Sequence, residues 1–146
     1  MDSALTMGGK HYSPLSLAAY FGRREIVKEI LKSHVKIDVN QQTIDRKHTP
    51  LYEAAAAKIN PNKDTRTLDV IESDYVEIIK NLGEAGADPN LAAISGAEGG
   101  EDGNTPLIIA TYLGHCERAA EIAKISTVDF GQSNSVGDNA LHKAVI

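Results

Sequence analysis

The feature that most constrains this chain is a six-residue pattern that recurs along it. The pattern is a hydroxyl residue, then Pro-Leu, two variable residues and Ala. It occupies residues 13–18, 49–54 and 105–110, with a looser copy at 139–144. The second positions of successive copies are 36, 56 and 34 residues apart. Recurrence at such intervals is typical of chains made of small units that bury their hydrophobic faces against one another.

Each residue type in the pattern has a physical role at the start of a helix. The hydroxyl of Ser13, Thr49 or Thr105 can accept a hydrogen bond from an orphan backbone N–H of the first turn. Proline then begins the helix without wasting a donor, leucine faces the core, and the small alanine lets neighbouring helices approach closely. Gly22 and Gly114 follow, and glycine suits the left-handed conformation that ends a helix. The pattern predicts a short first helix in each unit.

A second, amphipathic helix is predicted after each break. In the first unit, the apolar residues of segment 25–31 fall on one helical face. Equivalent helices are expected at 75–82 and 117–125. The chain therefore reads as a series of helix–turn–helix units.

These motifs resemble those of the ankyrin-repeat family. The recurring pattern is similar to the family's T-P-L-H-x-A signature, and residues 83–90 are similar to its E-A-G-A-D-V-N ending. The resemblance covers about residues 10–146 and implies an all-α fold, an ankyrin-repeat solenoid of stacked helix–turn–helix units with hairpin loops. The alternative is an irregular helical bundle in which the Pro-Leu pairs recur by chance.

The resemblance also implies a domain organisation. We expect an N-terminal extension at 1–9 and a repeat domain at 10–146, with repeats at about 10–43, 44–99 and 100–133 and a partial repeat at 134–146. The partial repeat would leave apolar residues without a second helix to cover them. We therefore expect the chain to be a fragment of a stack that continues.

The second repeat contains an insert at about 58–73, between its two helices. The first half is turn-like, whereas the second half extends the next helix backwards. An apolar stripe with helical spacing supports this extension and consists of Leu68, Ile71, Tyr75, Ile78 and Leu82. We predict a loop at 59–66 and a helix at about 67–82, capped by Thr67, Thr65 or Asp64. The insert is either a tolerated surface insertion or a projection that contacts a partner.

A second insert, at about 91–104, is glycine-rich and acidic. We expect it to form a solvated loop between repeats. A calcium-binding loop needs oxygen ligands at regular spacing, and Glu98, Glu101 and Asp102 do not provide that spacing.

Composition excludes several classes of partner. The net charge is −5, and the densest basic cluster is only Arg23, Arg24 and Lys28, so nucleic acid is not an expected partner. No apolar run approaches the roughly 18 residues of a membrane-spanning helix, so we expect no membrane insertion. Cys116 is the single cysteine, which favours the cytoplasm or another reducing compartment, including a host cell that receives the chain as a secreted effector.

The motifs of catalysis and metal binding are not found in the sequence. His11, His34, His48, His115 and His142 do not form an H-x-x-x-H pair, and a C-x-x-C pair is also lacking. His115 and Cys116 are neighbours, but adjacent helical side chains point about 100° apart. We therefore predict no enzyme, no catalytic residue, no metal site and no cofactor.

The resemblance implies where a partner protein would bind. In the family, partners contact the hairpin tips and the concave face formed by the first helices. By position, these sites are Tyr20, Asp45, Arg46, His48, Glu101, Asp102, Asn104 and Tyr112. Asn40 and Asn90 match a hairpin asparagine that is hydroxylated in some ankyrin proteins.

Two functional classes remain open at this point. The first is a non-catalytic module that binds another protein. The second is a targeting or regulatory segment of a larger protein, such as a bacterial effector or a multidomain enzyme. The fold does not name the partner.

Overall fold

A computed structural model describes residues 5–7, 10–33, 36–60, 62–94 and 103–133 of the chain. Within these ranges it contains six helices. They are α1 (Pro14–Tyr20), α2 (Arg24–Lys32), α3 (Pro50–Ala56), α4 (Leu68–Glu84), α5 (Pro106–Tyr112) and α6 (Cys116–Ala123).

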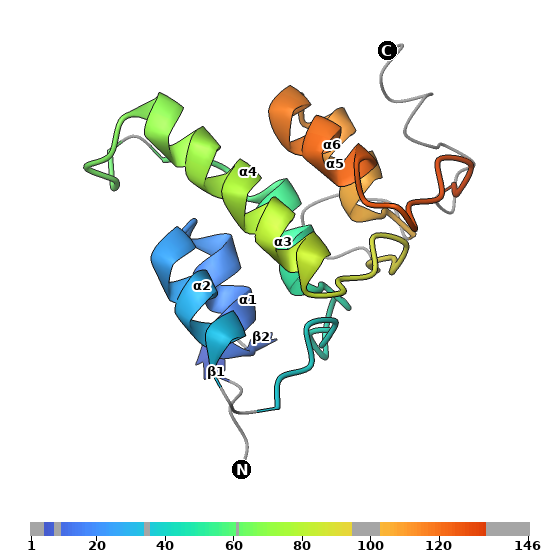
Figure 1. Ribbon diagram of the computed structural model, residues 1–146, viewed down its shortest axis with the longest axis horizontal. Helices are drawn as coiled ribbons and strands as arrows, with labels where there is room; N and C mark the ends of the chain where they lie inside the picture. The colour runs from blue at the N-terminus through green and yellow to red at the C-terminus, as the bar shows by residue number, and fades with distance from the viewer. Residues whose placement is uncertain (1–4, 8–9, 34–35, 61, 95–102, 134–146) are drawn as a thin grey trace.

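The helices form three helix–turn–helix units that stack side by side (Figure 1). The first helices pack in the order α1, α3, α5, and the second helices pack in the order α2, α4, α6. In Figure 1 the second helices lie in front of the first helices. The predicted all-α stack of helix–turn–helix units is confirmed.

A short β-hairpin precedes the first unit and was not predicted. Strand β1 (Leu5–Met7) pairs antiparallel with strand β2 (Lys10–Tyr12). Two strands of three residues are too short to produce a recognisable alternation in the sequence. The boundary expected between residues 9 and 10 falls between these two paired strands.

The first helices begin as the sequence predicts. The hydroxyl oxygens of Ser13, Thr49 and Thr105 accept hydrogen bonds from backbone N–H groups three residues later, at 3.1, 3.1 and 3.2 Å. Each cap is followed by proline at the first helical positions. The leucines after these prolines are all buried, so the core-facing assignment is confirmed.

Two of the first helices end at glycine and one does not. Gly22 and Gly114 have φ angles of 67° and 76°, the left-handed conformation that glycine adopts without strain. Helix α3 ends instead at Ala57, which leaves the helix with φ −57° and ψ 129°. The carbonyls at the end of α3 therefore need a different partner.

The long second helix of the middle unit is also confirmed. Helix α4 has 17 residues, and the Thr67 hydroxyl caps it by accepting from Val70 N at 3.3 Å. Four of the five residues in the predicted stripe are buried. The exception is Leu68, which is 55% exposed because it lies at the first position of the extension.

The core between the units is built from alanines and medium-sized aliphatic residues. The small side chains at the helix contacts are all buried and comprise Ala18, Ala19, Ala54, Ala55 and Ala110. They let the first helices approach closely, and larger residues of α4 and α6 fill the space beside them.

No helix in the described ranges is long and apolar enough to cross a membrane. Most of the second insert, including Glu101 and Asp102, lies outside the described residues, as does the predicted partial repeat at 134–146.

The two glycines that end first helices give a matched test of the packing. A Cβ atom at position 22 would lie 2.9 Å from Cζ of Tyr75, whereas one at position 114 would meet no atom within 4 Å. We expect Gly114→Ala to lower the free energy of unfolding by about 1 kcal/mol through backbone strain alone. Gly22→Ala should cost about 2 to 4 kcal/mol because overpacking adds to the strain. Urea denaturation measures both values, and equal losses would contradict the packing of Tyr75 on Gly22.

Candidate protein-binding face

The predicted partner-binding residues that the structure describes lie on what we call the first-helix face. It comprises α1, α3 and α5 and the loop residues that precede α3 and α5, which are 41–48 and, as far as they are described, 91–94 and 103–104. The two loops are joined where they are described, because Ile94 N donates to Arg46 O and Ala93 N donates to Asn104 O, both at 2.9 Å. Two of the predicted site residues therefore lie in directly connected segments.

The tip of the first loop is a tight turn. Thr43 closes it by donating its N–H to His48 O at 2.9 Å and by accepting from His48 N on its hydroxyl at 3.0 Å. Lys47 takes a positive φ of 58° inside the turn. The turn exposes Ile44 (68%) and the predicted contact residue Asp45, so an apolar and an acidic side chain stand together at the tip.

His48 connects this turn to α3. Its Nδ1 lies 2.8 Å from Glu53 Oε1, and its ring stacks on Tyr52 with centroids 4.3 Å apart. The Glu53 residue is only 4% exposed, and a buried carboxylate is costly unless it is hydrogen-bonded or paired. The half-buried His48 therefore anchors the turn.

Tyr12, the last residue of β2, is a buried phenol beside this face. Its pKa is raised to about 12, first by burial and then by the charge of Glu53, with smaller contributions from Tyr20 and Asp45, while Arg46 acts in the opposite direction. Tyr20, Asp45 and Arg46 therefore lie within electrostatic reach of one buried phenol. The sequence interpretation missed Tyr12 and Glu53, although Glu53 occupies one of the two variable positions of the recurring pattern on α3.

The predicted contact residues differ in exposure. Tyr20 is 43% exposed, and Tyr112 is 61% exposed. Asp45 is exposed, whereas Arg46 and His48 are half-buried. Asn104 is only 2% exposed, so its side chain belongs to the interior of the loop. Phe21 is 44% exposed and packs edge-to-face on Tyr20 with centroids 5.0 Å apart.

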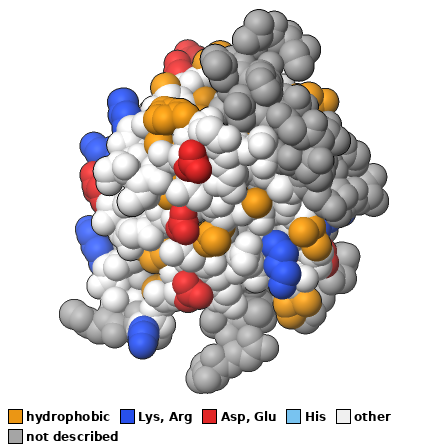
Figure 2. Space-filling view, turned by 90° about the vertical axis from the view of Figure 1, so that its right-hand side faces the viewer, with side chains coloured by type: hydrophobic (Ala, Val, Ile, Leu, Met, Phe, Trp, Pro, Cys, Tyr) orange, Lys and Arg blue, Asp and Glu red, His pale blue; other side chains and the backbone are white. Residues whose placement is uncertain are grey.

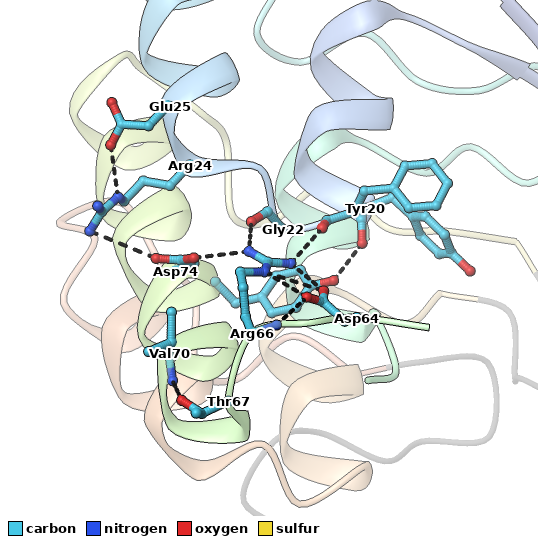
Figure 3. A network of polar contacts seen from close by, with 11 residues as sticks. Tyr20, Gly22, Arg24, Glu25, Asp64, Arg66, Thr67, Val70 and Asp74 are labelled. Atoms are coloured by element: carbon cyan, nitrogen blue, oxygen red, sulfur yellow. Dashed lines mark hydrogen bonds and ion pairs between the residues drawn. The ribbon is translucent and has the colours of Figure 1, made fainter. Parts of the chain in front are cut away.

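The backbone that carries Tyr20 and Phe21 is held from behind by the insert of the next unit (Figure 3). Arg66 donates from Nη1 to Gly22 O at 2.7 Å and from Nη2 to Phe21 O at 3.2 Å. Asp64 and Asp74 orient the guanidinium through further hydrogen bonds. The hydrogen bonds from Arg66 hold the pKa of the Asp64 carboxyl well below its usual range.

Tyr75 also contacts the end of α1. Its hydroxyl donates to Tyr20 O at 2.6 Å, and its ring lies against Gly22. Three consecutive carbonyls at the end of α1, those of residues 20 to 22, are therefore bonded by side chains of the second unit. An isolated helix end would leave these acceptors to water.

Side chains of the third unit bond the carbonyls at the end of α3 in the same way. Arg118 is fully buried and donates from Nη1 to the carbonyls of Ala54 and Ala57 at 3.1 and 2.6 Å, with a longer contact of 3.5 Å to Ala55 O. The Glu72 carboxylate of α4 pairs with the other side of the guanidinium. Arg118 replaces the glycine-type ending that α3 lacks.

Two further side chains strengthen this junction. His115 Nδ1 lies 3.0 Å from Ala55 O. The guanidinium of Arg118 also lies over the ring of Tyr75, 4.1 Å from its centroid. The His115 ring is engaged with α3, and Cys116 is exposed on α6, which gives no support to a thiol–imidazole pair. Within the described ranges, no three His, Cys, Asp or Glu side chains come together as metal ligands.

The loops carry an equivalent pair of asparagine contacts between units. Asn40 Oδ1 accepts from Asp88 N at 2.7 Å, and Asn90 Oδ1 accepts from Asp129 N at 2.8 Å. Asn90 also donates from Nδ2 to Thr127 O at 2.8 Å. The same residue type thus makes the same bond to the following unit at both junctions, which is the behaviour of a true structural repeat.

Comparison with known proteins agrees with this geometry. The family model described as the ankyrin repeat matches residues 10–44, which include α1 and α2. This segment of the chain is therefore an ankyrin repeat. No curated protein matches the chain. The number of ankyrin repeats beyond the matched segment stays a prediction.

Ankyrin repeats are generally protein–protein interaction modules and are typically non-catalytic. The contacts of Arg66, Tyr75, His115 and Arg118 fit this architecture because all four join one ankyrin unit to the preceding one. The sequence did not predict these roles. The carbonyls that they contact in the preceding unit lie 44 to 64 residues away along the chain, beyond the reach of any local pattern.

Because Arg118 is buried, we expect a large loss of stability when its guanidinium is removed. Arg118→Leu would leave the carbonyls of Ala54 and Ala57 without their donor and the Glu72 carboxylate without its cation. We expect the free energy of unfolding to fall by about 3 kcal/mol. Glu72→Gln should cost less, about 1 to 2 kcal/mol, since glutamine keeps a side-chain oxygen that can accept from the guanidinium and the carbonyl contacts of Arg118 are retained. If both variants lost the same amount, the carbonyl contacts would not be the main role of Arg118.

The buried tyrosines predict a stability that falls at high pH. Burial raises the pKa of Tyr75 and of Tyr12 from 10.0 to about 12. Between about pH 10 and pH 12 the unfolded chain releases protons that the folded protein retains, so the free energy of unfolding falls as pH rises. We expect Tyr75→Phe to reduce the slope from about two protons to about one.

Urea titrations at a series of alkaline pH values measure this slope. Tyr12→Phe provides the companion variant, because its phenol also has a raised pKa and its removal should reduce the slope by a similar amount. A slope unchanged in both variants would show that these phenols are not protected by the fold.

Proposed function

We propose that this ankyrin-repeat chain binds a partner protein through its first-helix face. The observation that carries the proposal is the display of Tyr20 and Tyr112. Each is the last residue of a first helix, and the two are 43% and 61% exposed. Tyrosine offers apolar area and a hydroxyl at low conformational cost, which makes it a frequent anchor of protein interfaces.

The loop tip supplies the second part of the proposed surface. Ile44 and Asp45 are exposed there, and Arg46 is half-buried beside them. The His48–Glu53 contact fixes this tip on α3, so the tip does not have to be ordered when the partner binds. Preorganisation of this kind favours affinity because less conformational entropy is lost on association.

A targeting or regulatory role within a larger protein is the second candidate. An ankyrin segment of a bacterial effector or of a multidomain enzyme would use the same surface to bring the attached domain to its target. A reading frame that encodes a catalytic domain beside this segment would favour this candidate over a free-standing module.

The binding proposal is tested by a double substitution. Alanine at Tyr20 and Tyr112 removes two aromatic anchors and leaves the buried core in place. We expect the captured partner to bind at least about tenfold more weakly, while the helical circular-dichroism signal is unchanged. The measurement is affinity capture from a cell lysate with mass-spectrometric identification, followed by titration of the captured protein against each variant.

The matched control is the double alanine variant of Leu68 and Val70. These residues are 55% and 46% exposed, but they lie on α4, one of the second helices. The control should retain the partner. A partner that binds the tyrosine variant as tightly as the native chain would refute the assignment of the first-helix face.

A further inference from the structure

A cleft of about 200 Å³ lies at the other side of the first unit, between the start of α2 and the start of α4. It is lined by Arg23, Arg24, Glu25, Ile26, Arg66 and Asp74. In Figure 3 the side chains of Arg24 and Asp74 lie on one side of Arg66, and Tyr20 lies on the other. The cleft is therefore a separate feature from the first-helix face.

Most charges in this cleft are already neutralised. Arg66 uses all its N–H groups, on Asp64, Asp74 and two backbone carbonyls. Asp74 lies 2.9 Å from Arg66 and 3.7 Å from Arg24. These groups form the wall of the cleft and are not available to a ligand. Their mutual pairing also gives the wall a fixed shape.

Arg23 is the cation that remains. Its side chain is exposed and makes no hydrogen bond or ion pair with any residue of the described ranges. Arg24 adds partial positive charge, because its one hydrogen bond and its 3.7 Å ion pair leave other N–H groups unengaged. Arg23, Arg24 and Arg66 line the cleft with Glu25 and Asp74, and Asp64 lies beside Arg66, so the positive charge open to a ligand is that of Arg23 and of the unengaged N–H groups of Arg24.

Ile26 gives the cleft an apolar edge. It is 52% exposed, although it lies within the first turn of α2, next to charged side chains. An exposed aliphatic residue beside an exposed guanidinium suits a ligand with one acidic and one aliphatic group. A volume of about 200 Å³ accommodates a side chain and is too small for a packed helix.

The geometry points to this cleft as a docking site for a segment of a partner protein in which a carboxylate side chain neighbours a bulky aliphatic residue. The carboxylate pairs with Arg23 and the free N–H groups of Arg24, and the aliphatic group covers Ile26. This second surface goes beyond the proposed function of the first-helix face and does not depend on it.

The net charge of the whole chain is −5, and Figure 2 shows acidic side chains in the middle of one side with most basic ones along its left edge. Charges are screened over roughly 8 Å at physiological salt, so the cluster at Arg23 acts locally. The attraction of Arg23 for an acidic segment is therefore of short range.

The test uses short fluorescein-labelled peptides and fluorescence polarisation. The main probe alternates glutamate with leucine, and two comparison peptides carry lysine in place of glutamate or alanine in place of leucine. We expect the glutamate–leucine peptide to bind, with affinity that falls as salt rises, and both comparison peptides to bind about tenfold more weakly or not at all. Binding of the lysine peptide at equal affinity would overturn the proposal.

Matched variants locate the binding. Arg23→Gln should lower the affinity for the glutamate–leucine peptide about tenfold. Lys32→Gln, which removes an exposed cation from the other end of α2, should leave the affinity unchanged. Ile26→Ala should lower the affinity for this peptide about threefold, and Ile44→Ala should leave it unchanged. Equal effects of Arg23→Gln and Lys32→Gln would show attraction by overall charge only and would overturn the assignment of the cleft.

A phosphoserine peptide separates carboxylate from phosphate recognition. We expect it to bind within about threefold of the glutamate peptide, and a preference of about a hundredfold would reassign the site to phosphorylated segments. Capture of a lysate partner by the first-helix face is measured with Tyr20 and Tyr112 variants, in which the cleft is intact. Failure of the peptide experiment therefore does not contradict the proposed function of the first-helix face. Failure of the lysate capture likewise does not contradict the assignment of the cleft.

Discussion

The structure depends on how the ends of very short helices are satisfied. Each first helix has seven residues, barely two turns, and a helix of that length leaves most of its terminal carbonyls without an internal partner. The next unit supplies the missing donors through Arg66 and Tyr75 for α1 and through Arg118 and His115 for α3. The stacking contacts between units therefore also complete the ends of α1 and α3.

This constraint changes how the insert in the second unit is interpreted. From the sequence it is either a tolerated insertion or a projection toward a partner. In the structure Arg66 and its partner Asp64 come from the insert loop, and their contacts are with the end of α1. The insert thus acts as a clasp between the first two units. The added turns of α4 support the same clasp, since Asp74 orients the guanidinium and Glu72 pairs with Arg118 at the next junction.

The sequence predicted the local features and missed the contacts between units. The Ser13, Thr49 and Thr105 caps, the left-handed glycines and the extended α4 all follow from neighbouring residues, and local patterns report such features well. The burial of Arg118 could not be predicted, because nothing in the sequence around this arginine distinguishes it from one that is exposed to solvent. Of the candidate site, Tyr20 and Asp45 are exposed as a contact surface requires, whereas Asn104 is buried in its loop.

The clasp also explains how one edge of the chain can present two different surfaces. The turn between α1 and α2 is fixed by side chains from the second unit, which bond the carbonyls of Tyr20, Phe21 and Gly22 from one side. The rings of Tyr20 and Phe21 are left exposed, and Arg23 begins the next helix with its guanidinium free of ion pairs among the described residues. Because the backbone is held by neighbours and not by its own side chains, those side chains are available for recognition. The same bonds that join the units therefore preorganise the aromatic pair and the basic cleft together.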